Sequence, residues 1–242
     1  MMRQCFTALA LVLTVSCFGE NVRVVLEPKE QTLVTSEVSS TIKAIERRMG
    51  ESFVEGDQLI LLNDVVFLAN LMKAKAQQIK AQTDFDSATQ LYKDRVISHS
   101  EFRETEANLA VAKADLALAE KAYDGCFVIA PYPGKVIDVF VKQYERVQPG
   151  QNLISILDDS TLTARVLIPE AYLGKLSIGD VVKVQIQETG SLENATIVRM
   201  GAVLDPVSSL MKVEAEIENK DGHLRAGMEG MLVFTNTPTK RP

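Results

Sequence analysis

The sequence predicts an α+β protein that is mainly β, with a small β-sandwich, a small β-barrel and an inserted antiparallel α-helical coiled-coil hairpin. Three observations lead to this fold class. Residues 65–124 contain neither Gly nor Pro, residues 40–64 are repeated at 134–158, and residues 160–237 alternate β-rich runs with turn residues. Hydrophobic residues make up 46% of the 242-residue chain, so it can bury a core.

Composition argues against several classes of function. A net charge of −6 lacks the basic footprint of a nucleic-acid-binding protein. Three Cys and two His cannot form a usual four-ligand zinc site without recruiting both His or carboxylates. No catalytic triad, Cys/His pair or glycine-rich phosphate loop stands out in the sequence. We therefore expect no enzyme activity and no cofactor.

The first residues have the layout of a secretory signal peptide, predicted over 1–19. A basic start precedes the apolar run Phe6–Val15, which is too short to span a bilayer. Cys17 is a candidate lipidation site, because Thr14–Cys17 resembles a bacterial lipobox. The alternative is ordinary cleavage nearby. Cys126 has no expected disulfide partner in an exported fold, so we predict that it is buried and inert.

Residues 65–124 have helix composition, with twelve Ala among them. The first helix is predicted from about Val65 to Tyr92, with an apolar stripe through Leu68, Met72, Ala76 and Ile79. Ser98 followed by Glu101 forms a capping-box pattern that starts a second helix. That helix carries a heptad seam of residues spaced alternately by three and four: Phe102, Thr105, Leu109, Ala112, Leu116, Ala119 and Tyr123.

The segments on either side of these helices form a repeat with an offset of 94 residues. Glu51 matches Glu145, Gly56 matches Gly150, and the apolar alternation around them is shared. Two such β units, each unable to bury its apolar face alone, predict a small sandwich with the hairpin inserted between its halves. Residues 160–237 then supply about six short strands and a short helix at Glu170–Leu176, as in a small barrel.

Several motifs, in this order and spacing, resemble one known family. These are Ile129–Val136, Val166–Glu170, Leu176–Val184 and Asn219–Met228. They are similar to motifs of the periplasmic adaptor subunits, or membrane fusion proteins, of the HlyD and RND-efflux kind. The resemblance implies that the sandwich is a split lipoyl-like domain. It divides the chain into a signal peptide (1–19), an N-terminal strand segment (20–37), a first lipoyl-like half (38–64), the hairpin (65–124), a second half (125–159), the barrel (160–237) and a tail (238–242).

The resemblance also implies partners and a location. Adaptors of this family link an inner-membrane transporter to a TolC-like outer-membrane channel in the transport of small molecules, and they assemble as trimers or hexamer rings. We expect an RND rather than an ABC transporter, and a periplasmic protein associated with the inner membrane of a Gram-negative-type cell. A further membrane-proximal domain, common in relatives, is expected to be missing or reduced, leaving membrane contact to the barrel or to a lipid on Cys17.

In this family the tip of the hairpin docks on the channel. The candidate docking residues are Leu91, Asp94, Arg95, Ser98 and His99. Leu91 and Ser98 match two positions of the family's tip motif, whereas the Arg expected four residues before the Leu is Ser87 here. Two structural alternatives stay open: Leu91 as a seam residue of the coiled coil, and Ser98 as a plain helix cap.

Three other functions are weighed against the adaptor. A swinging-arm lipoyl carrier needs an exposed Lys in a short tip motif, and no such motif is present. Four methionines, Met200, Met211, Met228 and Met231, could indicate copper or silver handling, since thioethers favour soft metal ions, but Met is also a common core residue. The third is a structural coiled-coil protein of the envelope that bridges other partners.

Overall fold

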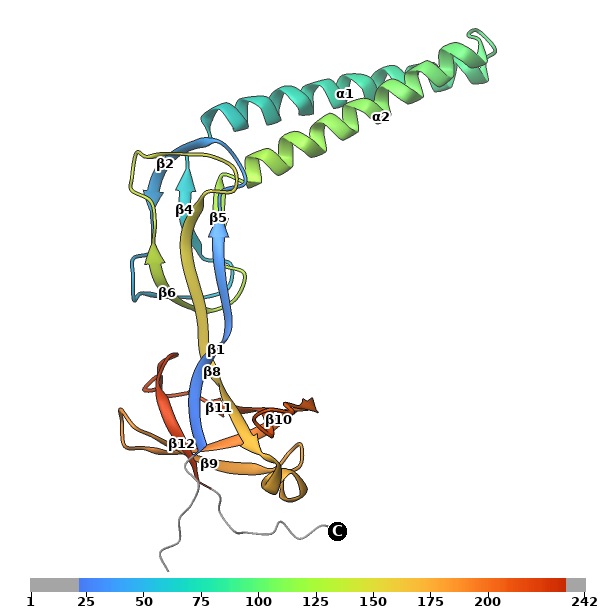
Figure 1. Ribbon diagram of the computed structural model, residues 1–242. Coiled ribbons are helices and arrows are strands. Elements are labelled where there is room, and N and C mark those ends of the chain that lie inside the picture. The colour runs from blue at the N-terminus through green and yellow to red at the C-terminus, as the bar shows by residue number, and fades with distance from the viewer. Residues whose placement is uncertain (1–21, 234–242) are drawn as a thin grey trace, which may run out of the picture. The chain divides into compact units, whose positions relative to one another are not determined.

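The computed structural model describes residues 22–233, which form two compact units (Figure 1). The hairpin unit comprises residues 28–162 and 219–225, and the β unit comprises residues 22–27, 163–218 and 226–233. The predicted signal peptide, the candidate lipidation site Cys17 and the tail 238–242 lie outside the described residues. Across the described chain, no helix is both long and apolar enough to cross a membrane.

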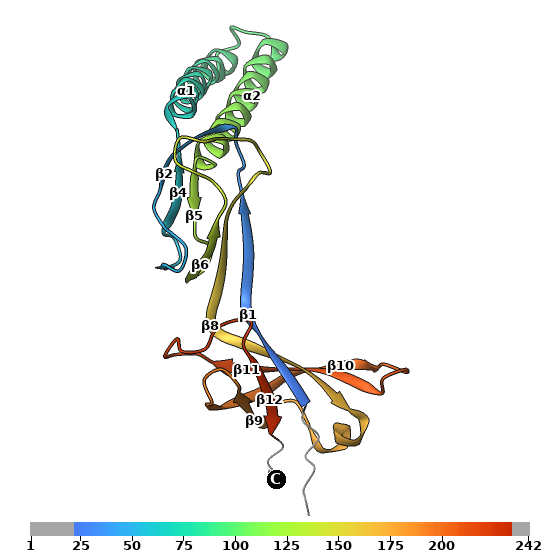
Figure 2. The same ribbon diagram turned by 60° about the vertical axis from the view of Figure 1, so that its left-hand side comes forward.

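Two helices dominate the hairpin unit. Helix α1 spans Val65–Lys93 and helix α2 spans His99–Asp124, and they lie side by side, joined by a short connection (Figures 1 and 2). They follow strand β4 (Gln58–Leu62) and precede strand β5 (Phe127–Ile129), so they are inserted within the β structure of the unit. The absence of Gly and Pro over this stretch explains why both helices run unbroken.

The predicted seam of α2 is confirmed, whereas the stripe predicted for α1 is wrong. On α2, Leu109 is buried and the other seam residues are partly buried. On α1, the buried residues are Ala74 and Ala88, while Met72 is 65% and Ile79 is 56% exposed. The inward face of α1 has its own alternating spacing of four and three: Phe67, Leu71, Ala74, Gln78, Ala81, Phe85, Ala88 and Tyr92. Ala74, Ala81 and Ala88 are among these residues, and their small side chains allow the helices to approach closely, whereas the predicted Leu68, Met72 and Ile79 lie outside the seam.

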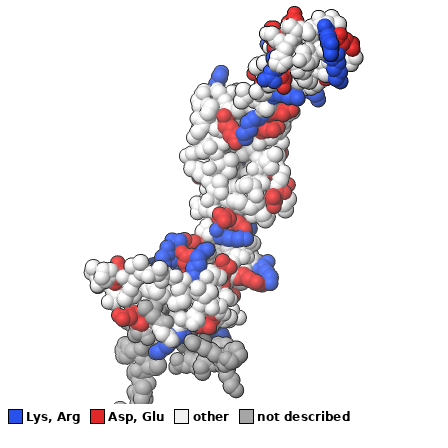
Figure 3. Space-filling view, turned by 90° about the vertical axis from the view of Figure 1, so that its right-hand side faces the viewer, with Lys and Arg blue, Asp and Glu red and all other residues white. Residues whose placement is uncertain are grey.

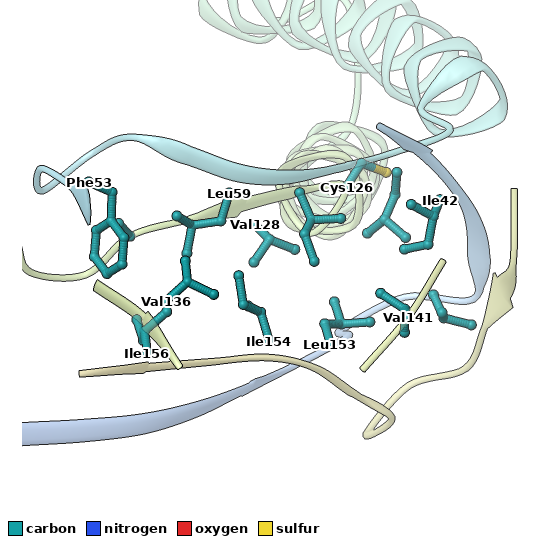
Figure 4. Close-up of a cluster of buried hydrophobic side chains, with 14 residues drawn as sticks. Ile42, Phe53, Leu59, Cys126, Val128, Val136, Val141, Leu153, Ile154 and Ile156 are labelled. Atoms are coloured by element: carbon teal, nitrogen blue, oxygen red, sulfur yellow. The ribbon is translucent and has the colours of Figure 1, made fainter. Parts of the chain in front are cut away.

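The β part of the hairpin unit is built from short strands around one core. Strands β5 (Phe127–Ile129), β4 (Gln58–Leu62), β2 (Ser40–Ile45) and β7 (Arg146–Val147) form one sheet in that order. Strand β3 (Ser52–Phe53) pairs with β6 (Gly134–Val139), which pairs with β8 (Asn152–Pro169). Figure 4 shows apolar side chains from both repeats meeting between these strands, among them Leu59, Val136 and Ile154.

The structure confirms the duplication, because corresponding residues make corresponding hydrogen bonds. The Arg48 amide donates to the Glu51 carboxylate at 3.0 Å, and 94 residues later the Lys142 amide donates to the Glu145 carboxylate at 2.9 Å. Gly56 and Gly150 occupy the same turn with φ of 86° and 82°, a left-handed conformation that favours glycine.

The two halves also exchange their hydrogen bonds. The Val136 amide donates to the Glu51 carbonyl, and the equivalent Ile42 amide donates to the Glu145 carbonyl, at 3.0 and 2.8 Å. The strand pairs are exchanged in the same way, since β2 pairs with β7 and β3 pairs with β6. Each half therefore completes the other around an approximate two-fold relation, as expected of units that cannot bury their apolar faces alone.

The β unit contains the remaining strands. They are the first part of β1 (Val22–Thr35), the last part of β8, β9 (Val181–Ile186), β10 (Leu192–Leu204), β11 (Leu210–Glu218) and β12 (Glu229–Val233). The sheet order is β1-β12-β9-β10-β11-β8, and a further pairing of β1 with β8 returns the order to its first strand, as in a small barrel. Burial alternates along β9 and β11, so one face of each strand lines a core.

Two details of the β unit differ from the prediction. Strand β8 begins at Asn152, inside the second repeat, and continues to Pro169, so a single strand crosses the boundary that was predicted between residues 159 and 160. The predicted short helix at Glu170–Leu176 is a 3₁₀ helix over Glu170–Lys175. Its single short stretch, which follows Pro169, suits the tighter 3₁₀ geometry.

Candidate docking site at the hairpin tip

The connection between the two helices is closed by a Schellman motif. The Val96 amide donates to the Leu91 carbonyl at 2.8 Å, and the Arg95 amide donates to the Tyr92 carbonyl at 3.0 Å. Arg95 takes the left-handed position of this motif, with φ of 59°. Glycine is usual there, and a residue with a Cβ costs about 1 kcal/mol in that conformation. The tip therefore keeps a long cationic side chain at a position where glycine would be more stable.

Ser98 begins α2 with the predicted capping box. The Glu101 amide donates to Ser98 Oγ at 3.2 Å, and the Ser98 amide donates to Glu101 Oε2 at 2.7 Å. The hydrogen bond from the Ser98 backbone, followed by that with its side chain, lowers the pKa of the Glu101 carboxyl. Ser98 is thus a helix cap, which fixes where the connection ends and leaves the residues before it on the outside of the turn.

A cluster of aromatic rings joins the end of α1 to the start of α2, next to the connection. The rings of Tyr92 and Phe102 stack with centroids 4.9 Å apart, and Phe85 meets Phe102 at 5.6 Å. The rings of His99 and Tyr92 meet in a T-shaped arrangement with centroids 6.0 Å apart, so His99 is part of this cluster. Such ring pairs stabilise the end of the hairpin beyond the area they bury. The cluster holds the two helix ends together where the seam would otherwise fray.

Leu91 lies outside the seam. Its side chain is 42% exposed, and the neighbouring Tyr92 makes the ring contacts with α2. The alternative in which Leu91 closes the coiled coil is therefore not what the structure has. Val96, which sequence reasoning did not single out, is 67% exposed within the connection. Val96 follows the left-handed residue of the Schellman motif, where an apolar side chain commonly packs on the residue five places before it, here Leu91. The sequence does not signal this turn because no glycine marks it.

The five candidate residues are thus gathered around one turn, but they differ in what they contact. All five are exposed, but Ser98 is also held by the helix cap and His99 by its ring contact with Tyr92. Ser87, at the place of the family's Arg, donates its hydroxyl hydrogen bond to the Thr83 carbonyl at 2.8 Å, within its own helix. Figure 3 shows acidic and basic side chains both present around this end of the molecule.

The other sequence candidates form no reactive site in the described chain. Cys126 is buried, as predicted, and burial raises the pKa of its thiol to about 11, so it stays protonated and unreactive. Among the described residues, no group of three or more His, Cys, Asp or Glu side chains could hold a metal ion. Of the four methionines, Met211 is buried in the core of the β unit, and the others are partly exposed.

Comparison with known sequences gives two distant relatives. No family model matches the chain. It is 23% identical over 211 residues to an uncharacterized protein of Haemophilus influenzae, an alignment that covers 86% of this chain and 55% of that protein. It is also 23% identical over 227 residues to the nodulation protein NolF of Rhizobium meliloti, covering 87% and 62% of the two chains. The chain thus spans less than two thirds of the length of these curated relatives.

Solved structures share the fold. A MacA–MexA chimera that contains the Pseudomonas aeruginosa MexA α-hairpin domain matches with a TM-score of 0.73 and 20% identity, covering 88% of this chain and 79% of the chimera. The membrane fusion protein Spr0693 of Streptococcus pneumoniae matches with 0.69 and 16%, covering 90% and 100%. MacA from Actinobacillus actinomycetemcomitans matches with 0.52 and 21%, covering 88% and 76%. The chain has the fold of the membrane fusion proteins, or periplasmic adaptors, as its sequence motifs predicted.

Proposed function

We propose that this chain is a periplasmic adaptor that links an inner-membrane efflux or secretion transporter to a TolC-like outer-membrane channel. The hairpin tip is the surface that docks on the channel, and the barrel-like β unit faces the transporter, expected to be of the RND class. The chain acts without catalysis and assembles as several copies, a trimer or a hexamer ring. The domain division predicted from the sequence, including the split lipoyl-like sandwich, is part of this proposal.

One observation carries the proposal. On a chain with the fold of membrane fusion proteins, the closed end of the hairpin presents Leu91, Arg95 and Val96 to solvent. Arg95 does so from a left-handed backbone position that favours glycine. Residues kept in an unfavourable conformation cluster where function needs them. An exposed apolar pair beside a cation suits a protein partner, since apolar side chains and Arg are typical of interface centres.

The hairpin delivers this tip at a distance with little loss of entropy on docking. Helix α1 has 29 residues and therefore extends about 43 Å at 1.5 Å per residue. Its end is fixed by the Schellman turn, the Ser98 cap and the stacked rings, so few side chains need to be ordered when a partner binds. A rigid rod of this kind suits a protein that bridges two membranes better than it suits a protein that binds a ligand in a pocket.

The test uses Leu91→Asp in cells that carry the tagged full chain as their sole copy. We expect export of the substrate and copurification of the outer-membrane channel to be lost, while the transporter is still retained and the melting temperature changes little. Val66→Asp is the matched control, because Val66 is also an exposed aliphatic residue of α1, 67% exposed, but lies at the opposite end of the helix. Loss of export by both variants, or by neither, would contradict docking at the tip.

Arg95 allows stability and docking to be separated. Arg95→Gly removes the backbone strain and should raise the melting temperature, yet it should weaken copurification of the channel because the cation is gone. Arg95→Lys retains a cation and should keep part of the binding. If Arg95→Gly bound the channel as well as the wild type, Arg95 would not be a docking residue.

A further inference from the structure

The outer face of the β unit is hollowed where strands β1, β8 and β11 lie next to one another. Along each of these strands, one set of side chains is buried in the core and the alternate set faces outward. The outward set encloses a hollow of about 620 Å³, a volume within the range of small-molecule sites. We call it the outer hollow, and its exposed or partly buried apolar residues are Val25, Leu167, Pro169 and Leu210.

The apolar part of the outer hollow is open to solvent. Leu167 is 53% and Val25 is 39% exposed, although their sequence neighbours Val166 and Val24 are buried in the core behind them. Apolar side chains that line a concave surface are typical of ligand-binding sites, whereas scattered exposed ones are not. The outer hollow can therefore cover the hydrocarbon part of a ligand.

The charged residues of the outer hollow are mostly basic. Arg23, Arg165 and Lys212 line it together with a single carboxylate, Glu27, in a chain whose net charge is −6. Two of the cations have a carboxylate partner, since Arg165 pairs with Glu27 and Arg23 pairs with Glu229. The hollow thus gathers positive charge on a protein that is acidic as a whole.

The third cation, Lys212, shares its partner with two other basic residues. The carboxylate of Glu214 lies 2.7 Å from Arg199 Nε, 3.5 Å from Lys212 Nζ and 3.7 Å from Arg165 Nε. The hydrogen bond from Arg199 lowers the pKa of Glu214, which is therefore ionised at neutral pH. One negative charge cannot neutralise three cations. Lys212, whose side chain is 50% exposed, keeps unneutralised positive charge beside the apolar surface.

This charge decides which occupant suits the outer hollow. The C-terminal residues 234–242 contain Lys240 and Arg241 and neither Asp nor Glu, so the cations of the hollow would repel their side-chain charges. The same face of a second copy would bring like charges together, which disfavours that contact. A small molecule with an apolar body and a negative head group matches both parts of the lining.

We propose that the outer hollow binds a single-chain amphiphile with a carboxylate head group. Its hydrocarbon chain covers Val25, Leu167 and Leu210, and its carboxylate competes with Glu214 as the partner of Lys212. The inference goes beyond the proposed function and does not rest on it, because these residues belong to the β unit and the docking residues belong to the hairpin unit.

The test is calorimetric titration of the purified full-length chain with dodecanoate, kept below the concentration at which it forms micelles. We expect saturable binding of one dodecanoate per chain. Dodecyltrimethylammonium has the same hydrocarbon chain and the opposite charge, and it should bind at least about tenfold more weakly. Equal binding of the two probes, or no binding of dodecanoate up to about 1 mM, would overturn the inference.

Paired substitutions test whether binding takes place in the outer hollow. Leu167→Asn and Lys212→Gln should each weaken dodecanoate binding by roughly tenfold, because one removes apolar contact and the other the charge partner. Val181→Asn and Lys183→Gln are the matched controls, since both residues lie on β9, outside the hollow, and Val181 is 58% exposed. Both controls should bind like the wild type. Equal losses in the controls, or wild-type affinity in the first pair, would place binding elsewhere.

A gain of affinity gives the sharpest test. Glu214→Gln removes the carboxylate that competes with the ligand, so dodecanoate should bind several-fold more tightly even though the melting temperature falls. A residue with a purely structural role would not produce this gain. Glu216→Gln, at the next outward-facing position of β11, should leave the affinity unchanged. Unchanged or weaker binding by a folded Glu214→Gln variant would contradict the proposed competition.

A membrane surface is the alternative that the last measurement separates. The chain is sedimented with vesicles of phosphatidylglycerol, and Lys212→Gln is compared with the wild type. Vesicle binding that is lost in Lys212→Gln, together with no binding of free dodecanoate, would assign the hollow to a lipid surface and overturn the inference. None of these measurements contains a transporter or a channel. The Leu91 and Arg95 variants test docking at the tip separately, so either proposal can fail without the other.

Discussion

The sandwich and the helical hairpin belong to one unit, yet they bury their apolar residues very differently. In the sandwich, Leu59, Ile60, Leu153 and Ile154 have no exposed surface. In the hairpin, helices of 29 and 26 residues bury Ala74, Ala88 and Leu109 and no other residue. The sandwich is held by a dense core, whereas the hairpin is held by helix propensity and one narrow seam. A rod with so thin a seam leaves most of its surface for contacts with other proteins.

The largest effects should come from the sandwich core. Ile154→Ala and its repeat equivalent Ile60→Ala each remove a fully buried side chain, and each should lower the free energy of unfolding by about 4 kcal/mol. Because the two residues occupy equivalent places in the two halves, the two losses should differ by less than the spread of about 2 kcal/mol that such substitutions show at unrelated sites. Urea unfolding of both variants would measure this. A large difference between them would show that the two halves are not energetically equivalent.

A slightly smaller effect is expected at Gly134, a position where the two halves of the repeat carry different residues. A Cβ added to Gly134 would lie 2.0 Å from the Leu157 carbonyl oxygen, so the backbone of β8 would have to move. Gly134→Ala should therefore destabilise the protein by about 3 kcal/mol. The equivalent residue in the first half is Ser40, and Ser40→Ala should cost less, through loss of its hydrogen bond to the Asn63 carbonyl. Thermal unfolding of the two variants tests this asymmetry.

The hairpin should respond more weakly and more locally. Leu109→Ala removes the one buried leucine of α2, at an expected cost of about 2 kcal/mol, because the open seam can collapse around the gap. Hydrogen exchange should quicken over α1 and α2 while protection of β2, β4 and β8 is unchanged. Equal loss of protection in the sandwich would mean that the two regions unfold as one.

The smallest effect concerns pH at the hairpin tip. The pKa of Glu101 is lowered in the folded protein by its capping hydrogen bonds, so the carboxylate form stabilises the fold. That contribution is complete above the ordinary pKa of 4.5 and is lost as the pH falls through the lowered folded value. The stability difference between the wild type and Glu101→Gln should therefore be largest near neutral pH and shrink below about pH 4.5. A difference that grew on acidification would contradict the capping role.

How far the sequence could predict this molecule depended on the kind of signal each region carries. The offset of 94 residues was readable because Glu51 and Gly56 recur as Glu145 and Gly150, and turns impose residue types on their positions. The seam of α2 was readable because its heptads contain Phe, Leu and Tyr. The seam of α1 could not be predicted, because its buried residues are Ala74 and Ala88, while larger aliphatic residues lie on the exposed face of the helix. The size of an apolar side chain does not show which face of a helix is buried.

The structure of the hairpin tip, too, could be predicted from the sequence only in part. Ser98 and Glu101 were recognisable because a capping box is a local pattern of residue types. The Schellman turn was not recognisable, since Arg95 occupies the left-handed position at which a glycine would have indicated the turn. The exposure of Val96 and the position of Leu91 outside the seam, where Tyr92 makes the ring contacts instead, could not be predicted either. They depend on how the helices meet, which no short stretch of sequence specifies.

The pairing of β4 with β5 has a consequence for how such proteins diversify. Leu61 lies opposite Phe127, so the chain leaves the sandwich and re-enters it at neighbouring positions. The inserted helices can then change in length without disturbing the fold that carries them, provided that each gains or loses whole heptads and the seam stays in register. One added heptad in each helix would extend the reach by about 10 Å. Evolution or protein engineering can thus adjust the length of the hairpin in steps, without changing the sandwich that carries it.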